Sequence, residues 1–521
     1  MTVPVARPLA ARTRRRQTPR AAIAALVALL IGVGTRARPA TTVPPGVQQR
    51  PVAVNRLAMQ VTNCGSFASD RLFIVSGGGG GLGVEFPRGT GKYLAFAGGL
   101  WFSGRAQGAL RTAVCEYGTE FMPGPAVAGG PGLDTLRFAV YATARGDTTG
   151  TGEWMARGVP LGAPVDASGT RPGLVGDQTL WTVFTDAGVT SSELYGHAPR
   201  TPIGLEVQLM AYAFDRPPVL QDVVFLHYRI FHKGDEPLDD AFVGLWYDAD
   251  IRTAAIPAGS DSSLDLGYVY RTSDDQEYGV AGPATGLCIL RGPRDPGTGT
   301  ALRVRSIVAW VNGVDPSDPA RREGVLHGLY PWGAPMVDST TLQPTLFYAS
   351  GDPVTGTGWL MPDRIDMKMA LGMGPLAFAP GDTLELDAAL VVGQGADRAG
   401  SVTALRANVR EARAAFADGF RSLPEPRPAA VGKLIARPLP SAGAIVFDLV
   451  VPSGGGVVTI DIVDLTGRRV RRLDAGSMPG GVQHVAWDGT RDGGERARPG
   501  IYFARARAAG GESTARVVLI P

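Results

Sequence analysis

The chain has 521 residues and a formal net charge of +3, a length that suffices for two to four domains with well-buried cores. Residues 1–40 hold eight arginines and no acid, so removing these eight charges from the +3 leaves about −5 on the rest of the chain. A mildly acidic body without a basic stripe argues against nucleic acid as a partner, because phosphate binding needs clustered lysine and arginine. Glycine (71) and proline (41) are abundant, but aromatic and β-branched residues occur throughout, which favours turn-rich β-structure over disorder.

Residues 1–40 have the pattern of a signal peptide: an arginine-rich start, an apolar run over residues 21–34, and small residues near Ala37 and Ala40. The apolar run has fourteen residues, whereas a membrane-spanning helix needs about 20. We therefore expect export, no membrane span after cleavage, and a secreted or cell-surface location. A short lead segment, residues 41–54, follows.

Residues 55–423 form the predicted main region, which we expect to be all-β: a large β-sandwich region with one or two sandwiches. The clearest strands are residues 222–231 and 240–247, joined by a Gly-Asp-Glu-Pro turn. Both alternating sets of residues 223–231 are largely apolar, so this strand should be covered on both faces. One late helix is predicted over residues 402–420, with Ser401 or Thr403 as its cap.

A proline-rich stretch, residues 424–440, predicts a semi-rigid linker. Beyond it, residues 441–521 form what we call the C-terminal module. Runs of alternating apolar residues at 444–450, 457–464, 482–487, 501–508 and 513–520 predict a small immunoglobulin-like (Ig-like) β-sandwich. We expect the strand that follows Pro499 and Gly500 to bury Ile501 and Phe503.

The turn residues of the C-terminal module carry a resemblance to known families. They are Gly467, Trp487, Asp488, Gly489, Pro499, Gly500 and Tyr502. In this order they resemble the Ig-like domain of the flagellar hook-capping scaffold and the C-terminal sorting domain of type IX secretion substrates. The main region in turn resembles uncharacterised secreted bacterial proteins that bear such modules, through motifs such as residues 98–101, 176–181 and 351–359. The resemblance implies attachment or sorting, with secretion machinery or cell-surface components as partners.

Four acids, Asp248, Asp250, Asp261 and Asp265, form the densest carboxylate cluster, just after the predicted central hairpin. Carboxylate oxygens suit a hard cation, so one interpretation is a structural calcium site. The alternative is a set of solvated turn acids that accept hydrogen bonds from nearby backbone N–H groups. No other cofactor is indicated.

Two of the eight tryptophans, Trp332 and Trp359, fall in predicted loops rather than in apolar strands. Loop tryptophans can stack on sugar rings, so we expect these two residues to bind a ligand, if any tryptophan does.

Catalytic signatures are lacking in the sequence. Lys92 follows Gly91 in a Gly-Thr-Gly-Lys stretch, but Phe86 and Tyr93 stand where a phosphate-binding loop needs a glycine and a serine or threonine hydroxyl. The five histidines form no zinc-binding pair, and there is no Gly-x-Ser-x-Gly elbow. We therefore predict a non-enzymatic structural or interaction protein. One alternative is a carbohydrate or surface-ligand binding module; another is a secreted, glycosidase-like hydrolase whose paired carboxylates the sequence does not reveal.

Overall fold

The computed structural model describes residues 47–521 apart from residues 71–82, 117–118, 128–137, 148, 188–200, 252–255, 275, 363–365, 424–433, 452–455, 479–480 and 509–510. The predicted signal peptide and most of the predicted linker lie outside the described residues.

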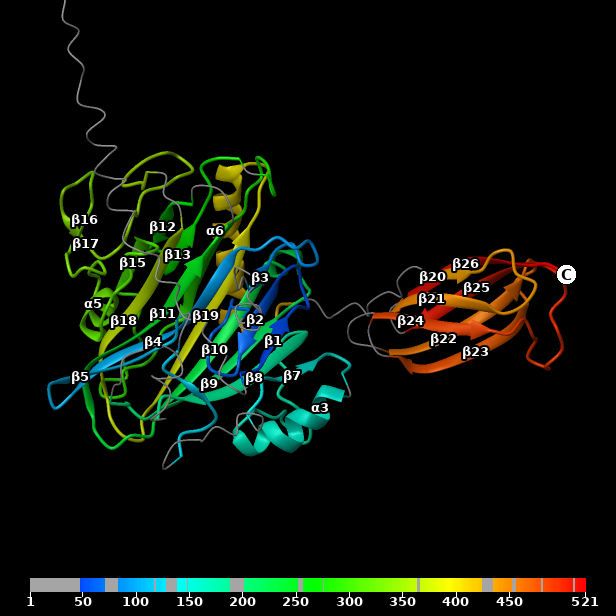
Figure 1. The fold of residues 1–521 in the computed structure, drawn as a ribbon, viewed down its shortest axis with the longest axis horizontal. Coiled ribbons are helices and arrows are strands. Elements are labelled where there is room, and N and C mark those ends of the chain that lie inside the picture. The colour runs from blue at the N-terminus through cyan, green and yellow to red at the C-terminus, as the bar shows by residue number, and fades with distance from the viewer. Residues whose placement is uncertain are drawn as a thin grey trace, which may run out of the picture. The chain divides into compact units, whose positions relative to one another are not determined.

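The main region is a single sandwich of two large antiparallel sheets (Figure 1). The strands of the larger sheet are β6 (Met122–Pro123), β7 (Tyr141–Ala144), β8 (Gln178–Thr185), β9 (Leu205–Ala213), β10 (Val223–His232), β12 (Ala258–Asp261), β13 (Leu266–Val269), β14 (Ala284–Arg291) and β19 (Thr383–Gly393). Their order is β12-β13-β14-β19-β10-β9-β8-β6, with β7 paired to β8. The strands of the smaller sheet are β4 (Ala95–Ala106), β5 (Ala109–Val114), β11 (Leu238–Ala249), β15 (Ser306–Val311) and β18 (Met367–Phe378). They run in the order β15-β18-β11-β4-β5, so the predicted all-β sandwich class is confirmed.

Two smaller sheets accompany the sandwich. One contains β1 (Gln49–Val52), β2 (Ala58–Thr62) and β3 (Val84–Glu85), and the other is a hairpin of β16 (Met336–Val337) and β17 (Pro344–Thr345). Strand β1 falls inside the predicted lead segment, which therefore contributes residues to a sheet.

Strand β10 is covered on both faces, as its two apolar sets predict. Val224 and Leu226 belong to the core between the two sheets. Val223 and Phe225 instead belong to a second core, between the larger sheet and helix α6 (Arg398–Ala417). The helix therefore covers the outer face of the larger sheet.

Helix α6 begins earlier than predicted. Its N-cap is Asp397, whose backbone is extended and whose Oδ1 accepts a hydrogen bond from the Gly400 amide at 2.7 Å. The expected caps, Ser401 and Thr403, lie inside the helix because Asp397 already satisfies the first free N–H groups. The other α-helices of the described chain are α3 (Thr149–Glu153) and α5 (Pro319–Leu326). None of the described helices is long and apolar enough to cross a membrane.

The three cysteines of the chain are buried. Cys115 belongs to the core between the sheets, and Cys288 belongs to the core beneath helix α6. Burial raises the pKa of Cys288 to about 12, so this thiol stays protonated.

The C-terminal module is a separate small sandwich with its own apolar core. Its strands are β20 (Leu434–Arg437), β21 (Ile445–Val451), β22 (Gly456–Asp464), β23 (Arg469–Met478), β24 (Gly481–Trp487), β25 (Gly500–Ala508) and β26 (Gly511–Leu519). One sheet has the order β20-β21-β24 and the other β23-β22-β25-β26 (Figure 1). Strand β20 lies in the predicted linker and pairs with β21, so the module begins by residue 434.

Candidate functional site

Asp261 and Asp265, two of the predicted calcium ligands, flank the turn between β12 and β13 and are held by arginines. Asp261 Oδ2 lies 3.3 Å from Nε of Arg406 on helix α6. Asp265 Oδ2 lies 3.0 Å from Arg303 Nη2 and 3.3 Å from Arg413 Nη2, also on α6. These carboxylates therefore fasten helix α6 to the β12–β13 hairpin, with guanidinium groups as their counter-charges.

Asp248 and Asp250 lie elsewhere, at the end of β11. Asp248 is fully buried, and its cross-strand neighbour on β18 is Lys368. The buried Lys368 Nζ donates to both carboxylate oxygens of Asp315 at 2.8 Å. Asp250 follows the strand, and its amide donates to the Leu94 carbonyl at 3.0 Å.

The structure does not bring the four predicted acids together as a ligand set. Among the described residues, one group of at least three Asp, Glu, His or Cys side chains has ligand atoms within 4.8 Å of one another, and none of the four belongs to it. A calcium ion takes about six to eight oxygens at roughly 2.4 Å, which such a dispersed arrangement does not offer.

The group that does converge consists of Asp240, Glu323 and His327. None of these residues is among the ligands predicted from the sequence. Glu323 lies on α5 and His327 is the C-cap of that helix, whereas Asp240 lies on β11. Burial lowers the pKa of His327, so the imidazole is neutral at pH 7. Of this set, the Glu-x-x-x-His spacing is visible in the sequence, but Asp240 joins only through the fold.

Trp359, one of the two predicted ligand-binding tryptophans, is a core residue. Its side chain is only 5% exposed and belongs to the core of the sandwich, where its ring centroid lies 5.4 Å from that of Tyr348. The prediction that Trp359 binds a ligand is therefore wrong. The residue sits in an irregular segment of the chain, but that segment packs against the core.

Trp332 is 50% exposed, in a loop after helix α5. Its ring stacks on Tyr330, with centroids 4.4 Å apart and planes 10° from parallel. The loop is held by a hydrogen bond from the Gly333 amide to the Tyr330 carbonyl (2.7 Å), and Arg321 of α5 donates to the Pro331 carbonyl (3.2 Å). Gly333 has a φ of 88°, which glycine adopts without strain. We call Tyr330 and Trp332 the aromatic platform.

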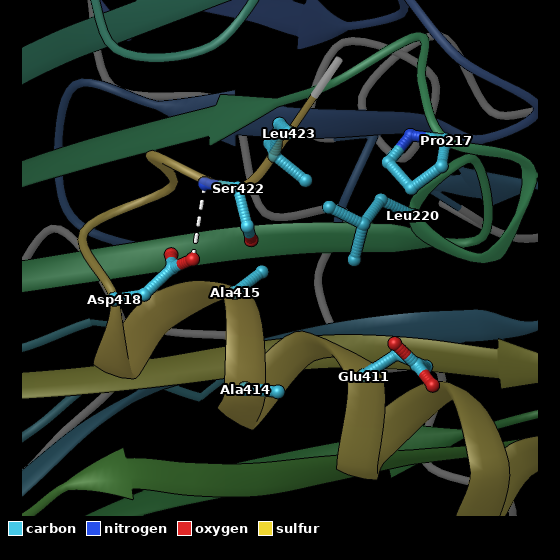
Figure 2. Close-up of a pocket in the computed structure, with 8 residues that line it drawn as sticks. All are labelled: Pro217, Leu220, Glu411, Ala414, Ala415, Asp418, Ser422 and Leu423. Atoms are coloured by element: carbon cyan, nitrogen blue, oxygen red, sulfur yellow. Dashed lines mark hydrogen bonds between the residues drawn. The ribbon is translucent and has the colours of Figure 1, made fainter.

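A pocket of about 260 Å³ lies at the C-terminal end of helix α6. Figure 2 shows its lining residues: Pro217, Leu220, Glu411, Ala414, Ala415, Asp418, Ser422 and Leu423. Its two carboxylates, Glu411 and Asp418, are seven residues apart, which separates their backbones by about 10 Å along a helix. Asp418 accepts the Ser422 amide at 3.0 Å, and hydrogen bonding from Ser422 lowers its pKa. Asp418 therefore lacks the raised pKa that a glycosidase acid requires.

The motif residues of the C-terminal module stabilise its core and its turns through packing and hydrogen bonds. Trp487 is fully buried, donates from Nε1 to the Thr490 carbonyl (2.8 Å), and contacts Tyr502 edge to face at 5.9 Å. The Tyr502 hydroxyl donates in turn to the Arg498 carbonyl at 2.6 Å. Asp488 Oδ1 accepts hydrogen bonds from both the amide and the hydroxyl of Thr490 (2.9 and 2.6 Å).

Two glycines of the motif occupy turns that need positive φ. Gly467 and Gly489 have φ values of 82° and 79°. Gly500, directly after Pro499, is the first residue of β25 and pairs with Leu519 of β26.

The predicted burial of Ile501 and Phe503 is wrong. Ile501 is 40% exposed, whereas Tyr502 (6%), Ala504 (0%) and Ala506 (0%) face the core. The contact between Tyr502 and Trp487 sets the orientation of the strand, and successive residues then alternate between the two faces.

Comparison with known proteins identifies one domain. Residues 439–512 match the family described as the FlgD Ig-like domain, which confirms the resemblance of the C-terminal module to the hook-capping Ig-like domain. No curated protein matches the chain.

Three solved structures are distantly similar. Dimeric latent PorU from Porphyromonas gingivalis is 12% identical over 66% of this chain and 31% of its own, with a TM-score of 0.17. The adhesin domain of Epf from Streptococcus pyogenes is 10% identical over 58% and 81%, with a TM-score of 0.15. The ectodomain of the Caenorhabditis elegans fusion protein EFF-1 is 7% identical over 91% and 94%, with a TM-score of 0.14. Scores this low carry no argument about fold or function.

Proposed function

We propose that this chain is an exported, non-enzymatic structural or interaction protein whose C-terminal module serves attachment or sorting. The observation that carries the proposal is the match of residues 439–512 to the FlgD Ig-like domain, together with a core that the module closes by itself. The arginine-rich, apolar pattern of residues 1–40 supports export. The partners are then components of a secretion machinery or of the cell surface.

The test is to locate the native protein by cell fractionation and to measure its intact C-terminal mass. We expect exported protein in the surface or medium fraction, and a chain that lacks residues 434–521 should change compartment. Trp487→Ala, which removes the core of the module but keeps its length, should mislocalise in the same way. Trp332→Ala serves as the matched control and should locate like the native protein. A deletion that leaves the location unchanged would contradict a role in attachment or sorting.

The intact mass separates the two roles of the module. Exported protein that lacks the last eighty or so residues would make the C-terminal module a removed sorting signal. Exported protein with the full C-terminus would make it a permanent attachment domain.

A second candidate function is supported by the aromatic platform: binding of a carbohydrate or another surface ligand by the main region. A half-exposed tryptophan stacked on a tyrosine offers a flat apolar face, on which a sugar ring can pack. In a glycan array, Trp332→Ala should remove binding. Leu342→Ala is the control, because Leu342 is 74% exposed and large but lies outside the platform. Turnover of a polysaccharide instead of simple binding would favour the secreted hydrolase.

A further inference from the structure

Asp240, Glu323 and His327 come from two elements that the fold brings together. Glu323 and His327 are four residues apart, so helix α5 and its C-cap place them on one face. Asp240 lies on β11 where the register with β18 shifts, and its φ of 48° is in the left-handed region. Such a bulge re-aims a side chain. One ligand atom of each residue lies within 4.8 Å of those of the other two.

Two polar atoms of this group are buried without a hydrogen-bond partner: Glu323 Oε1 and His327 Nε2. Glu323 is only 7% exposed. Leaving a buried polar atom unsatisfied is costly, and both of these atoms belong to residues of the converging group. No described residue forms a hydrogen bond with either atom, whereas a metal cation could accept a lone pair from each.

The remaining contacts hold the two side chains in place without occupying these atoms. The other carboxylate oxygen of Glu323, Oε2, accepts a hydrogen bond from Arg105 Nη2 at 2.7 Å. The His327 ring stacks on Phe242 with centroids 3.9 Å apart. Contacts of this kind orient metal ligands in protein sites, because they fix the side chain while leaving the donor atom available.

We propose that Asp240, Glu323 and His327 bind a divalent transition-metal ion of the Zn²⁺ class. An imidazole with two carboxylates suits Zn²⁺ or a neighbouring transition metal, whereas Ca²⁺ and Mg²⁺ take oxygen ligands. Two atoms that each lie about 2.1 Å from zinc are at most roughly 4.2 Å apart, and the three ligand atoms already lie within 4.8 Å of one another, so at most a small movement is needed to bring them onto the ion. The exposed Asp240 can make that movement, and its exposure leaves one coordination position open to solvent.

The experiment uses the full chain, treated with chelator, dialysed and titrated calorimetrically with Zn²⁺. We expect binding of one equivalent and a rise in the melting temperature of the main region. Asp240→Asn should weaken binding at least tenfold while keeping the fold, because asparagine tolerates positive φ and Asp240 is exposed. His327→Ala should weaken binding to a similar degree.

The control is His484→Ala, which removes an exposed histidine of the C-terminal module that is paired with Asp448. It should bind Zn²⁺ as the native chain does. Absence of Zn²⁺ binding by the native chain, or binding that neither Asp240→Asn nor His327→Ala weakens, would overturn the proposal. Because the readout is metal affinity, it is independent of where the protein is located and therefore of the proposed function.

Discussion

The two sandwiches of this protein differ in how many charged residues they bury. Among the described residues of the C-terminal module, Asp461 is the one buried charged residue. Its Oδ1 lies 3.0 Å from Nε of Arg472, which neutralises the charge. In the main region the described charged residues that are buried are Glu120, Asp177, Asp186, Asp222, Asp248, Asp265, Arg271, Glu323, Lys368 and Asp387. Burial of charge opposes folding unless partners compensate it. The module is thus stabilised mainly by its apolar core and its turns, whereas the main region also holds buried charges in ion pairs, such as that of Lys368 with Asp315.

The largest effect should come from the core of the C-terminal module. Trp487→Ala should lower the free energy of unfolding of the module by about 3–5 kcal/mol, because it empties a fully buried site. Calorimetry of the full chain should show the transition of the module shifted and that of the main region unchanged. If both transitions move together, the two sandwiches do not unfold as separate units.

The matching change in the main region is Gly393→Ala. A Cβ on Gly393 would lie 2.0 Å from the Leu405 amide nitrogen of helix α6, so the helix must move away from the sheet. We expect a loss of about 1–3 kcal/mol, confined to the main-region transition. Gly152→Ala is the control, because a Cβ there meets no atom within 4 Å. Equal stability of Gly393→Ala and the native chain would contradict the close packing of α6.

A smaller effect, with a distinct pH dependence, is expected from Asp222→Asn. Burial raises the pKa of Asp222 from 3.8 to about 6, against the lowering effect of Arg56. A raised carboxylate pKa means that the folded state binds the proton more tightly than the unfolded state, so ionisation between pH 4 and pH 6 removes stability. At pH 7.5 the variant should be more stable by about 2 kcal/mol, and the difference should vanish near pH 4. Urea unfolding of the native and variant chains at both pH values measures this.

Asp177→Asn should change the pH dependence of stability in the opposite direction. Burial raises the pKa of Asp177, but hydrogen bonds from the Asp215 amide, Arg145 and Arg216 lower it by more, so the net shift is downward. Its contribution to stability is present above the unfolded pKa and is lost as the pH falls. The variant should therefore be less stable than the native chain at pH 7 and converge with it in acid. Parallel pH profiles for the Asp177 and Asp222 variants would refute the contrast.

The smallest effect on stability is expected for Trp332→Ala, because half of that side chain is already exposed. We expect a change within about 0.5 kcal/mol. A large loss in a thermal melt would mean that the aromatic platform holds the main region together, in which case loss of ligand binding by this variant would not identify a binding site.

Local patterns in the sequence predict the fold class well. The two apolar sets of β10 predict its double coverage, and the turn glycines with Trp487 predict the Ig-like module. Boundaries are predicted less well, because side-chain caps and short edge strands leave weak signals: Asp397 starts α6 early, and β20 falls in an apparent linker.

The sites were harder to predict because they depend on contacts between distant residues. Trp359 lies in an irregular segment that only the fold buries. The acids near residue 260 form a cluster in sequence, but the arginines that neutralise two of them come from later in the chain, including α6. Asp240 meets Glu323 and His327 across more than eighty residues of sequence.

The reactivity of the three buried thiols reports local opening of the main region. All of them lie in the main region, so a thiol-reactive dye labels the chain only as fast as that region exposes them and is insensitive to the C-terminal module. Cys288 becomes accessible when helix α6 lifts from the larger sheet, whereas Cys115 requires the two sheets to part. The labelling rates of the two positions therefore rank these two openings without any engineered probe.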